Sequence, residues 1–196
     1  WERPLWFAPD GVEPIDQLDF LDPGWKKFAA AEHRAVRECV ALIDQSSFAK
    51  FEIIGPGVVA ALQNLCVSDM DKPVGAIIYT QMCNESGGTE ADVTFIRMGS
   101  DHFYLVTGSG FGVHDSDWIK KNMPKDGLIH LLDVTSGKAV LNIVGPMSRE
   151  VLAKVSESDI SNSAIPFSKS CEIVVGTAQV LAARLGYVGE LGYELH

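Results

Sequence analysis

A short pattern that occurs twice constrains the fold more than any other feature of this chain. Segments 51–56 and 141–146 each read as an apolar strand closed by Gly-Pro, at an offset of 90 residues. Each leads into helical spacing of apolar residues, over 58–66 and 148–155. An aspartate precedes each copy, Asp44 in the first and Asp133 in the second. We interpret the pattern as a duplicated strand-helix unit.

Further elements follow from the spacing of apolar residues. Helical spacing predicts helices over 25–42 and 113–122. A loop of turn-forming residues, 84–89, lies between two apolar strands and predicts a hairpin. Strands and helices alternate irregularly, so we expect an α+β fold with mainly antiparallel sheets. The expected strands cover 48–54, 75–82, 93–98, 103–106, 178–185 and 193–195.

The two ends of the chain differ from its middle. Residues 1–24 are expected to form an extended arm or linker, because Trp1, Trp6 and Phe7 stand among prolines without a period. One domain is expected over 25–196. The chain starts without a methionine, and His196 closes a strand-like segment without a turn. Both ends are therefore interpreted as cuts, which predicts a truncated domain with another domain upstream.

Composition disfavours several classes of partner. The formal net charge is −10, which argues against nucleic acid and against an anionic membrane surface. No apolar run approaches the roughly 20 residues that a membrane span needs, so a soluble protein is expected. The four cysteines form no Cys-x-x-Cys pair and the five histidines show no ligand spacing. Neither a disulfide framework nor a metal site is expected.

A glycine-rich loop follows the strand at 103–106. Residues 107–112 read Thr-Gly-Ser-Gly-Phe-Gly and include Gly108 and Gly110. The loop lacks the full Gly-x-Gly-x-x-Gly pattern and no parallel βαβ unit surrounds it, which disfavours a dinucleotide site. Two interpretations stay open: a flexible connection between strand and helix, or a loop whose main chain lines a small-molecule pocket.

Two groups of polar residues suit chemistry. Asp92 follows the glycine turn at the start of an apolar strand, where a carboxylate is either capped by local N–H groups or used in function. Tyr187, Glu190 and Glu194 surround two glycines near the end of the chain. Tyrosine offers a flat face and a carboxylate accepts paired N–H bonds, which is the chemistry that binds a planar heterocycle. A plain strand pair is the alternative.

Two motifs resemble a known family. Residues 84–92, Asn-Glu-Ser-Gly-Gly-Thr-Glu-Ala-Asp, resemble the Asn-Glu-x-Gly-Gly-x-x-x-Asp segment of the glycine cleavage T-protein, the aminomethyltransferase. Residues 186–194 are similar to its Gly-Tyr-x-Gly-Glu-x-Gly-x-Glu segment. Segments 2–7, 107–110 and 114–115 resemble the folate half of dimethylglycine and sarcosine dehydrogenases. Segment 118–126 is similar to the regulatory subunit of pyruvate dehydrogenase phosphatase.

The resemblance implies the aminomethyltransferase fold with tetrahydrofolate in a central cavity, where it takes up a one-carbon unit and forms 5,10-methylenetetrahydrofolate. Asp92 would orient the pterin and assist its nitrogen as a proton acceptor or electrostatic stabiliser. Tyr187 and Glu194 would line the pterin and hydrogen-bond to it, and Tyr79 would be a weaker lining candidate. Backbone contacts would come from the loop that contains Gly108 and Gly110. The acidic residue that often precedes the key aspartate in the family is Ala91 here.

The same resemblance implies a function for the longer protein. We expect a folate-binding, one-carbon-accepting part of a dimethylglycine or sarcosine dehydrogenase-like oxidoreductase, with FAD held only by an upstream domain of the same chain. The piece alone is not expected to be active. A stand-alone aminomethyltransferase and a non-catalytic regulatory module are the alternatives. The expected compartment is the mitochondrial matrix for a eukaryotic source and the cytoplasm for a bacterial one. Which amine is oxidised stays open.

Overall fold

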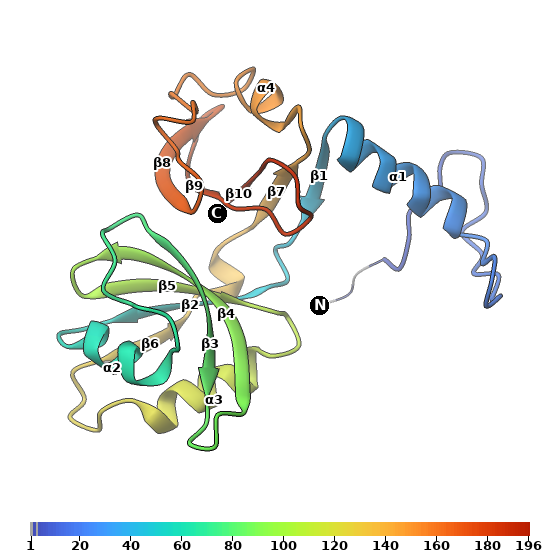
Figure 1. Ribbon diagram of the computed structural model, residues 1–196. Coiled ribbons are helices and arrows are strands. Elements are labelled where there is room, and N and C mark those ends of the chain that lie inside the picture. The colour runs from blue at the N-terminus through green and yellow to red at the C-terminus, as the bar shows by residue number, and fades with distance from the viewer. Residues whose placement is uncertain (1, 3) are drawn as a thin grey trace.

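The structure, a computed structural model, describes residue 2 and residues 4–196. Two five-stranded sheets lie next to each other, and a long helix projects to one side (Figure 1). The first sheet has the strands β2 (Ala49–Ile54), β3 (Ile77–Cys83), β4 (Thr89–Gly99), β5 (His102–Thr107) and β6 (His130–Asp133), in the order β3-β4-β5-β2-β6.

The second sheet repeats this arrangement. Its strands are β1 (Ala41–Asp44), β7 (Leu141–Val144), β8 (Lys169–Val175), β9 (Ala178–Arg184) and β10 (Gly192–Leu195), in the order β1-β7-β10-β9-β8. The helices are α1 (Lys26–Glu38), α2 (Val58–Leu65), α3 (Gly112–Asn122) and α4 (Ser148–Leu152), with a short 3-10 turn η1 (Thr135–Gly137). The strand pairs of both sheets are antiparallel, which confirms the predicted α+β class.

The duplication is confirmed, and the two copies exchange strands. Each copy consists of a strand, a turn, a second strand, Gly-Pro and a helix. The first strand of each copy pairs with the second strand of the other, since β1 pairs with β7 and β6 pairs with β2. Asp44 lies opposite Leu141, and Asp133 lies opposite Phe51. The two sheets are therefore tied together by a pair of equivalent crossings.

Equivalent polar contacts hold the two crossings in register. Asp44 accepts a hydrogen bond from the backbone N–H of Ser46 at 2.8 Å, and Asp133 accepts one from Thr135 at 2.9 Å. The Ser46 hydroxyl then accepts from the N–H of Val140 at 3.1 Å. The Thr135 hydroxyl likewise accepts from the N–H of Lys50 at 3.0 Å. The two aspartates that precede the copies in the sequence are thus turn residues with a structural task.

Three clusters of apolar side chains show that each sheet has an outer face, covered by helices and loops, and an inner face towards the other sheet. One cluster fills the space between the first sheet and helices α2 and α3, and a second packs α4 and the segment after it against the second sheet. The third includes Ile77, Ile96 and Tyr104 of the first sheet and Ala183 of the second. We call the first two clusters the outer cores and the space between the two sheets the junction. Successive side chains along a strand point to opposite faces, so the residues next to those of the outer cores face the junction.

The open ends of the two sheets are also linked. Ala76 forms a bridge with Lys169, and the N–H of Ile77 donates to the carbonyl of Ser168 at 3.0 Å. The N–H of Ser170 donates to the carbonyl of Gly75 at 2.8 Å. These bonds join the starts of β3 and β8, so the junction is held at both sides.

Several predicted elements have different limits. The helix expected over 25–42 ends at Glu38, because Cys39 leaves the helical conformation and 41–44 forms β1. Apolar residues of that strand continued the helical spacing by coincidence. The helix expected over 148–155 ends at Leu152. Strands β6 and β8 were missed, because β6 is mostly exposed and β8 has mixed burial, which leaves little alternation in the sequence.

Helix α1 lies apart from the two sheets (Figure 1). None of its residues is buried, and the ring of Trp6 stacks on Phe28 with 5.5 Å between the centroids. The predicted arm thus packs on α1 through Trp6, while Trp1 and Arg3 lie outside the described residues. An ion pair of 2.8 Å between Arg37 and Glu190 ties the end of α1 to the loop before β10. In the described part of the chain, no helix has the length and apolarity of a membrane span.

The glycine that ends each repeated strand is required by backbone crowding. Gly55 and Gly145 have φ angles of 144° and 120°, in the region that favours glycine. A Cβ on Gly145 would lie 2.5 Å from the carbonyl oxygen of Cys39 and 2.9 Å from Cα of Val40. A Cβ on Gly55 would meet the backbone of Leu128 and Ile129 in the equivalent way. These close approaches let the exchanged strands cross.

Replacing Gly145 by alanine is expected to lower the free energy of unfolding by about 2–5 kcal/mol. A left-handed backbone costs alanine about 1–2 kcal/mol, and forced overpacking costs about 1–3 kcal/mol more. Gly137→Ala is the matched control, because no atom lies within 4 Å of its added Cβ; its effect should stay within about 0.5 kcal/mol. Urea unfolding of the intact protein measures both, and equal midpoints for the two variants would contradict the crowding argument.

Candidate functional site

Asp92 lies at the centre of a side-chain cluster on the junction face of the first sheet. The β3–β4 register places Gln81 opposite Asp92 and Tyr79 opposite Thr94. Asp92 accepts a hydrogen bond from the Tyr79 hydroxyl at 2.8 Å on one carboxylate oxygen. Its other oxygen accepts from the Gln81 amide at 3.0 Å. The turn before β4 is capped instead by Asn84, whose side-chain oxygen accepts from two backbone N–H groups. The cluster of Asp92, Tyr79 and Gln81 is therefore separate from the hydrogen bonds that hold the turn.

The Tyr79 phenol is held as a proton donor. Its hydrogen bond to Asp92, followed by loss of solvent, raises its pKa above the ordinary value. The negative charge that Tyr187 would carry adds to the same shift, so the two phenols lie within electrostatic range of each other. Both rings remain open to solvent, with 63% of Tyr79 and 89% of Tyr187 exposed. Two flat faces are available beside Asp92.

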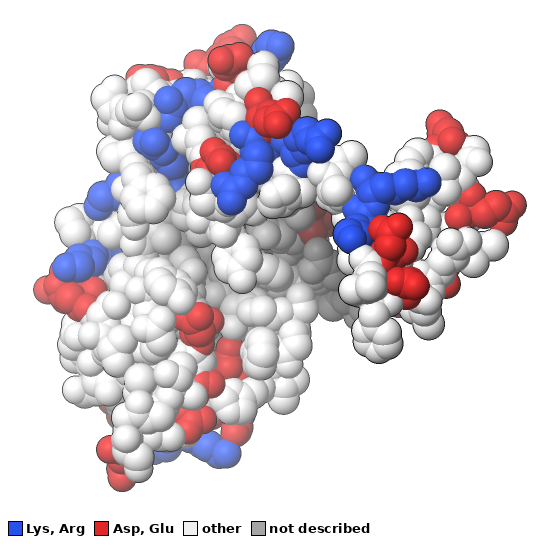
Figure 2. All heavy atoms as spheres, turned by 45° about the vertical axis from the view of Figure 1, so that its right-hand side comes forward, with Lys and Arg blue, Asp and Glu red and all other residues white. Residues whose placement is uncertain are grey.

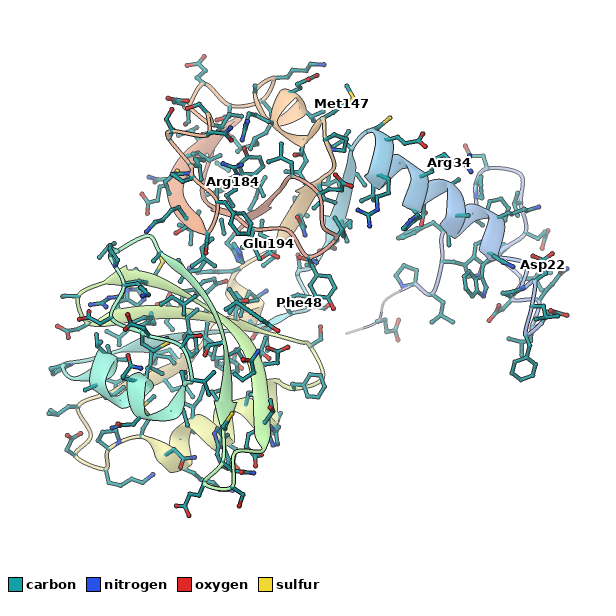
Figure 3. All side chains as sticks on the ribbon, in the orientation of Figure 1. Asp22, Arg34, Phe48, Met147, Arg184 and Glu194 are labelled. Atoms are coloured by element: carbon teal, nitrogen blue, oxygen red, sulfur yellow. The ribbon has the colours of Figure 1, made fainter. Side chains whose placement is uncertain are left out.

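Glu194 lies in the second sheet and points to the junction (Figure 3). It is 7% exposed, between two residues, Tyr193 and Leu195, that pack in the outer core. One carboxylate oxygen lies 3.5 Å from Nε2 of His196. Asn142 is its register partner on β7 and is fully buried. Among the described residues, neither amide atom of Asn142 has a hydrogen-bond partner.

Basic groups lie beside this carboxylate cluster. The ammonium of Lys138 is 3.3 Å from Glu52 and 4.8 Å from the centre of the Tyr104 ring. Lys50 is fully buried, and its ammonium donates to the carbonyls of Ser46 at 2.8 Å and Lys138 at 2.6 Å. Burial lowers the pKa of Lys50. The junction is therefore lined by polar groups of both signs.

The glycine-rich loop begins at the same end of the first sheet as Asp92. The register pairs Thr94 with Val106, so the loop follows β5 where Asp92 precedes Thr94 on β4. A Cβ on Gly108 would lie 3.0 Å from the Phe111 ring. No atom lies within 4 Å of a Cβ built on Gly110, so local packing does not require a glycine there.

A buried carboxylate anchors this loop to α3. Asp115 accepts a hydrogen bond from the Thr107 hydroxyl at 2.6 Å. Its other oxygen lies 3.0 Å from Nδ1 of the partly exposed His114. Asp115 lies in the first turn of α3, where it is buried and links the strand to the helix. The loop is therefore fixed at both ends.

The predicted site residues fall into two clusters. Tyr79 and Asp92 are in direct contact and Tyr187 is near them, whereas Glu194 belongs to a buried cluster with His196 and Asn142. Gln81 was missed, although its position two residues after Tyr79 on one strand was a usable signal. His196 follows Glu194 by the same spacing. Nothing in the sequence marks Asn142.

Surface features elsewhere fit a ligand less well. A hollow of about 680 Å³ is lined by α1 residues and the preceding Trp25, and one helix cannot enclose a ligand. Another of about 610 Å³ lies between Asn64, Cys83 and Trp118. Within the described part of the chain, no group of three or more His, Cys, Asp or Glu is placed to hold a metal. Figure 2 shows charges of both signs over the second sheet and α1, with much uncharged surface over the first sheet.

Replacing Asp92 by asparagine is expected to lower the pKa of Tyr79 towards its ordinary value of 10.0, because the charged acceptor is lost. Gln81→Leu is the comparison variant and should raise this pKa further, since the Gln81 hydrogen bond lowers it. An NMR titration of ring-labelled tyrosine measures both shifts. A Tyr79 pKa that is the same in wild type and Asp92→Asn would show that the Tyr79–Asp92 bond does not form in solution.

Known proteins resemble the chain over its whole length. Residues 1–196 match the family described as GCVT N-terminal domain. The 4-methylaminobutanoate oxidase (formaldehyde-forming) of Paenarthrobacter nicotinovorans is 33% identical over 195 residues, which are 100% of this chain and 24% of that protein. The mitochondrial dimethylglycine dehydrogenase of Homo sapiens is 32% identical over 197 residues, 100% of this chain and 23% of that protein.

A regulatory protein and a solved transferase complete the comparison. The mitochondrial pyruvate dehydrogenase phosphatase regulatory subunit of Mus musculus is 33% identical over 202 residues, 100% of this chain and 23% of that protein. The glycine cleavage system aminomethyltransferase T from Bartonella henselae superposes with a TM-score of 0.73 at 23% identity, over 84% of this chain and 44% of that one. This likeness confirms the predicted fold. The chain spans about a quarter of the curated relatives named here, and it belongs to the GCVT N-terminal domain family.

Proposed function

We propose that this domain binds tetrahydrofolate at the junction of the two sheets and accepts a one-carbon unit within a dimethylglycine or sarcosine dehydrogenase-like protein. The Asp92 cluster is the observation that carries the proposal. Asp92 is fixed by the side chains of Tyr79 and Gln81 and is not used to cap the turn. A carboxylate oriented in this way at a solvent-accessible face is suited to act on a ligand.

The residues at the junction suit the chemistry of a pterin. A pterin is flat, and its aminopyrimidine edge carries N–H donors. The exposed rings of Tyr79 and Tyr187 offer flat faces. The nearly buried carboxylate of Glu194 is an acceptor for paired N–H groups. Asn142 adds a buried amide whose hydrogen bonds are unmade among the described residues, where a polar ligand would lower the cost of burial.

Each residue then has a defined task. When bound, tetrahydrofolate would supply the two nitrogens, N5 of the pterin ring and N10 of the attached aminobenzoate, between which the one-carbon unit is held in 5,10-methylenetetrahydrofolate. Asp92 accepts a proton or stabilises positive charge as the carbon is taken up. Tyr79 and Gln81 keep its two oxygens in place, and Ala91 leaves it without a second carboxylate immediately before it. Gly108 and Gly110 allow the main chain to approach the ligand.

The wider protein would supply the one-carbon unit. We expect a flavin-dependent oxidoreductase domain elsewhere in the same chain. This chain matches only about a quarter of each relative, and those relatives include proteins named as oxidases and dehydrogenases. FAD belongs to that domain in this proposal. Since several of these relatives are named as mitochondrial, the matrix is the proposed location for a eukaryotic source, and the cytoplasm for a bacterial one.

A regulatory module is the second candidate. The regulatory subunit of pyruvate dehydrogenase phosphatase matches the whole chain at 33% identity, about as well as the named oxidase. A regulatory module would keep the fold and its outer cores without needing Asp92 to act on a ligand. A stand-alone aminomethyltransferase is the third candidate, and it would use the same folate site as the first.

Titration of tetrahydrofolate into the full-length protein is expected to show saturable binding. Glu194→Gln should weaken the affinity about 10- to 150-fold, because hydrogen bonds to charged groups contribute about 1.5–3 kcal/mol. Asp92→Asn should instead lower the rate of one-carbon transfer by about 10²- to 10⁴-fold, the usual worth of a general base. Calorimetry and a single-turnover transfer assay separate these effects.

Glu190→Gln is the matched control for Glu194→Gln. Glu190 lies in the same segment, but its carboxylate pairs with Arg37 on α1 and not with the junction. Its affinity for tetrahydrofolate should stay within two- to three-fold of wild type, as expected for a surface ion pair. A full-length protein that binds no tetrahydrofolate would overturn the proposal and favour the regulatory module.

A further inference from the structure

We infer that Tyr104 and His196 are positioning residues that hold the Glu194 carboxylate in the orientation that receives the pyrimidine edge of the ligand. The inference rests on the proposed function. It adds two residues, one from each sheet, that do not touch the ligand themselves and act through Glu194.

The three side chains form a continuous line across the junction. The Tyr104 hydroxyl on β5 lies 3.1 Å from Nδ1 of His196, and Nε2 of His196 lies 3.5 Å from Oε2 of Glu194. Their surroundings are dry, since Tyr104 and the His196 side chain are each 1% exposed. The two rings also pack edge to face, with 5.2 Å between centroids and 88° between planes. The imidazole is therefore fixed between hydroxyl and carboxylate.

The backbone fixes the imidazole as well. His196 and Leu181 exchange two backbone hydrogen bonds of 3.0 Å, which continue the pairing of β10 with β9. His196 follows Glu194 by two residues, so both side chains lie on the same face of the strand. Tyr104 faces them from the first sheet, where it packs with Ile77 and Ile96. Glu194 and His196 are thus held by the β10–β9 pair, and Tyr104 is held by β5 of the first sheet.

The direction of the hydrogen bonds follows from charge. If the Tyr104 hydroxyl donates to Nδ1, an imidazole with one proton carries it on Nε2, on the side of the carboxylate. The reverse arrangement would aim the Nε2 lone pair at a carboxylate, which is repulsive. Burial, with smaller effects of Glu52 and Glu194, raises the pKa of Tyr104, so the hydroxyl keeps the proton it donates. The Lys138 ammonium lies over the Tyr104 ring, 4.8 Å from its centre.

This contact leaves part of Glu194 free for a ligand. A carboxylate has about four acceptor positions, and Nε2 of His196 lies beside one of its two oxygens without forming a hydrogen bond to it. The separation of 3.5 Å is longer than a strong hydrogen bond, so the imidazole acts on the carboxylate by its position and its polarity. Holding one oxygen restricts rotation of the carboxylate. The entropy of fixing its orientation is then not lost on binding.

The test uses full-length protein, tetrahydrofolate and its 2-desamino-2-methyl analogue, which lacks the amino group that Glu194 would accept from. Tyr104→Phe and His196→Phe keep the packed rings, and they remove the Tyr104 hydroxyl and the His196 ring nitrogens, respectively. Each is expected to weaken tetrahydrofolate binding about ten-fold, because a misoriented Glu194 would lose about one charge-assisted hydrogen bond to the ligand. The double variant should be no worse than either single one, because both act through the same carboxylate. Affinity for the analogue should change less than about three-fold.

Two further variants separate positioning from general stability. Tyr193→Phe removes a buried hydroxyl that accepts from Arg149 at 2.9 Å and donates to Ile160 at 3.3 Å, on the opposite face of β10. It should lower the melting temperature and leave both affinities unchanged. His196→Gln retains one donor and one acceptor and should recover part of the affinity that His196→Phe loses.

The outcomes are distinct. Wild-type binding with equal losses for tetrahydrofolate and its analogue, or variants that change only the melting temperature, would overturn the positioning role and leave the folate site standing. Absence of binding by wild-type protein would overturn the proposed function, and the inference with it. Selective, non-additive losses with partial rescue by glutamine would support the inference.

Discussion

The exchange of strands between the two repeated units is the constraint on which the rest of the structure depends. Because β1 pairs with β7 and β6 pairs with β2, neither unit completes its sheet without the other. The exchange requires two chain crossings at close range, and Gly55 and Gly145 are the residues that permit them. A second link between the starts of β3 and β8 closes the opposite side. The relative position of the sheets is thus set by backbone pairing as well as by side-chain packing.

The polar junction follows from the way in which the outer faces of the two sheets are covered. Outer faces of both sheets are covered by helices and loops that supply apolar cores, so alternate residues on the same strands face inward. At one side these inward residues are apolar, and elsewhere they are Asp92, Glu194, Asn142 and Lys50. Charges and amides that are removed from water need partners. In the proposed function, a flat polar ligand provides some of those partners between two surfaces that the backbone already holds apart.

The sequence predicted the repeated unit because Gly-Pro after an apolar strand is a local signal that survives in both copies. It also predicted the hairpin around Asn84, whose side chain caps the turn. It could not predict the exchange of strands, since pairing between residues 76 to 103 positions apart leaves no local mark. For the same reason β1 was taken for the end of a helix. In the site, Asp92 was predicted from a motif and Tyr79 as a weaker lining candidate from the resemblance, and the two are in contact. Asn142 and Tyr104 reach the junction through strand register that only the fold reveals.

A crystal structure of the full-length protein with tetrahydrofolate bound tests the central claim most directly. The account predicts a pterin ring at the junction between the sheets, beside Tyr79 and Tyr187, with its amino edge on Glu194 and a reactive ring nitrogen within reach of Asp92. Tetrahydrofolate found in another part of the protein, with the Asp92 cluster facing only solvent, would contradict it.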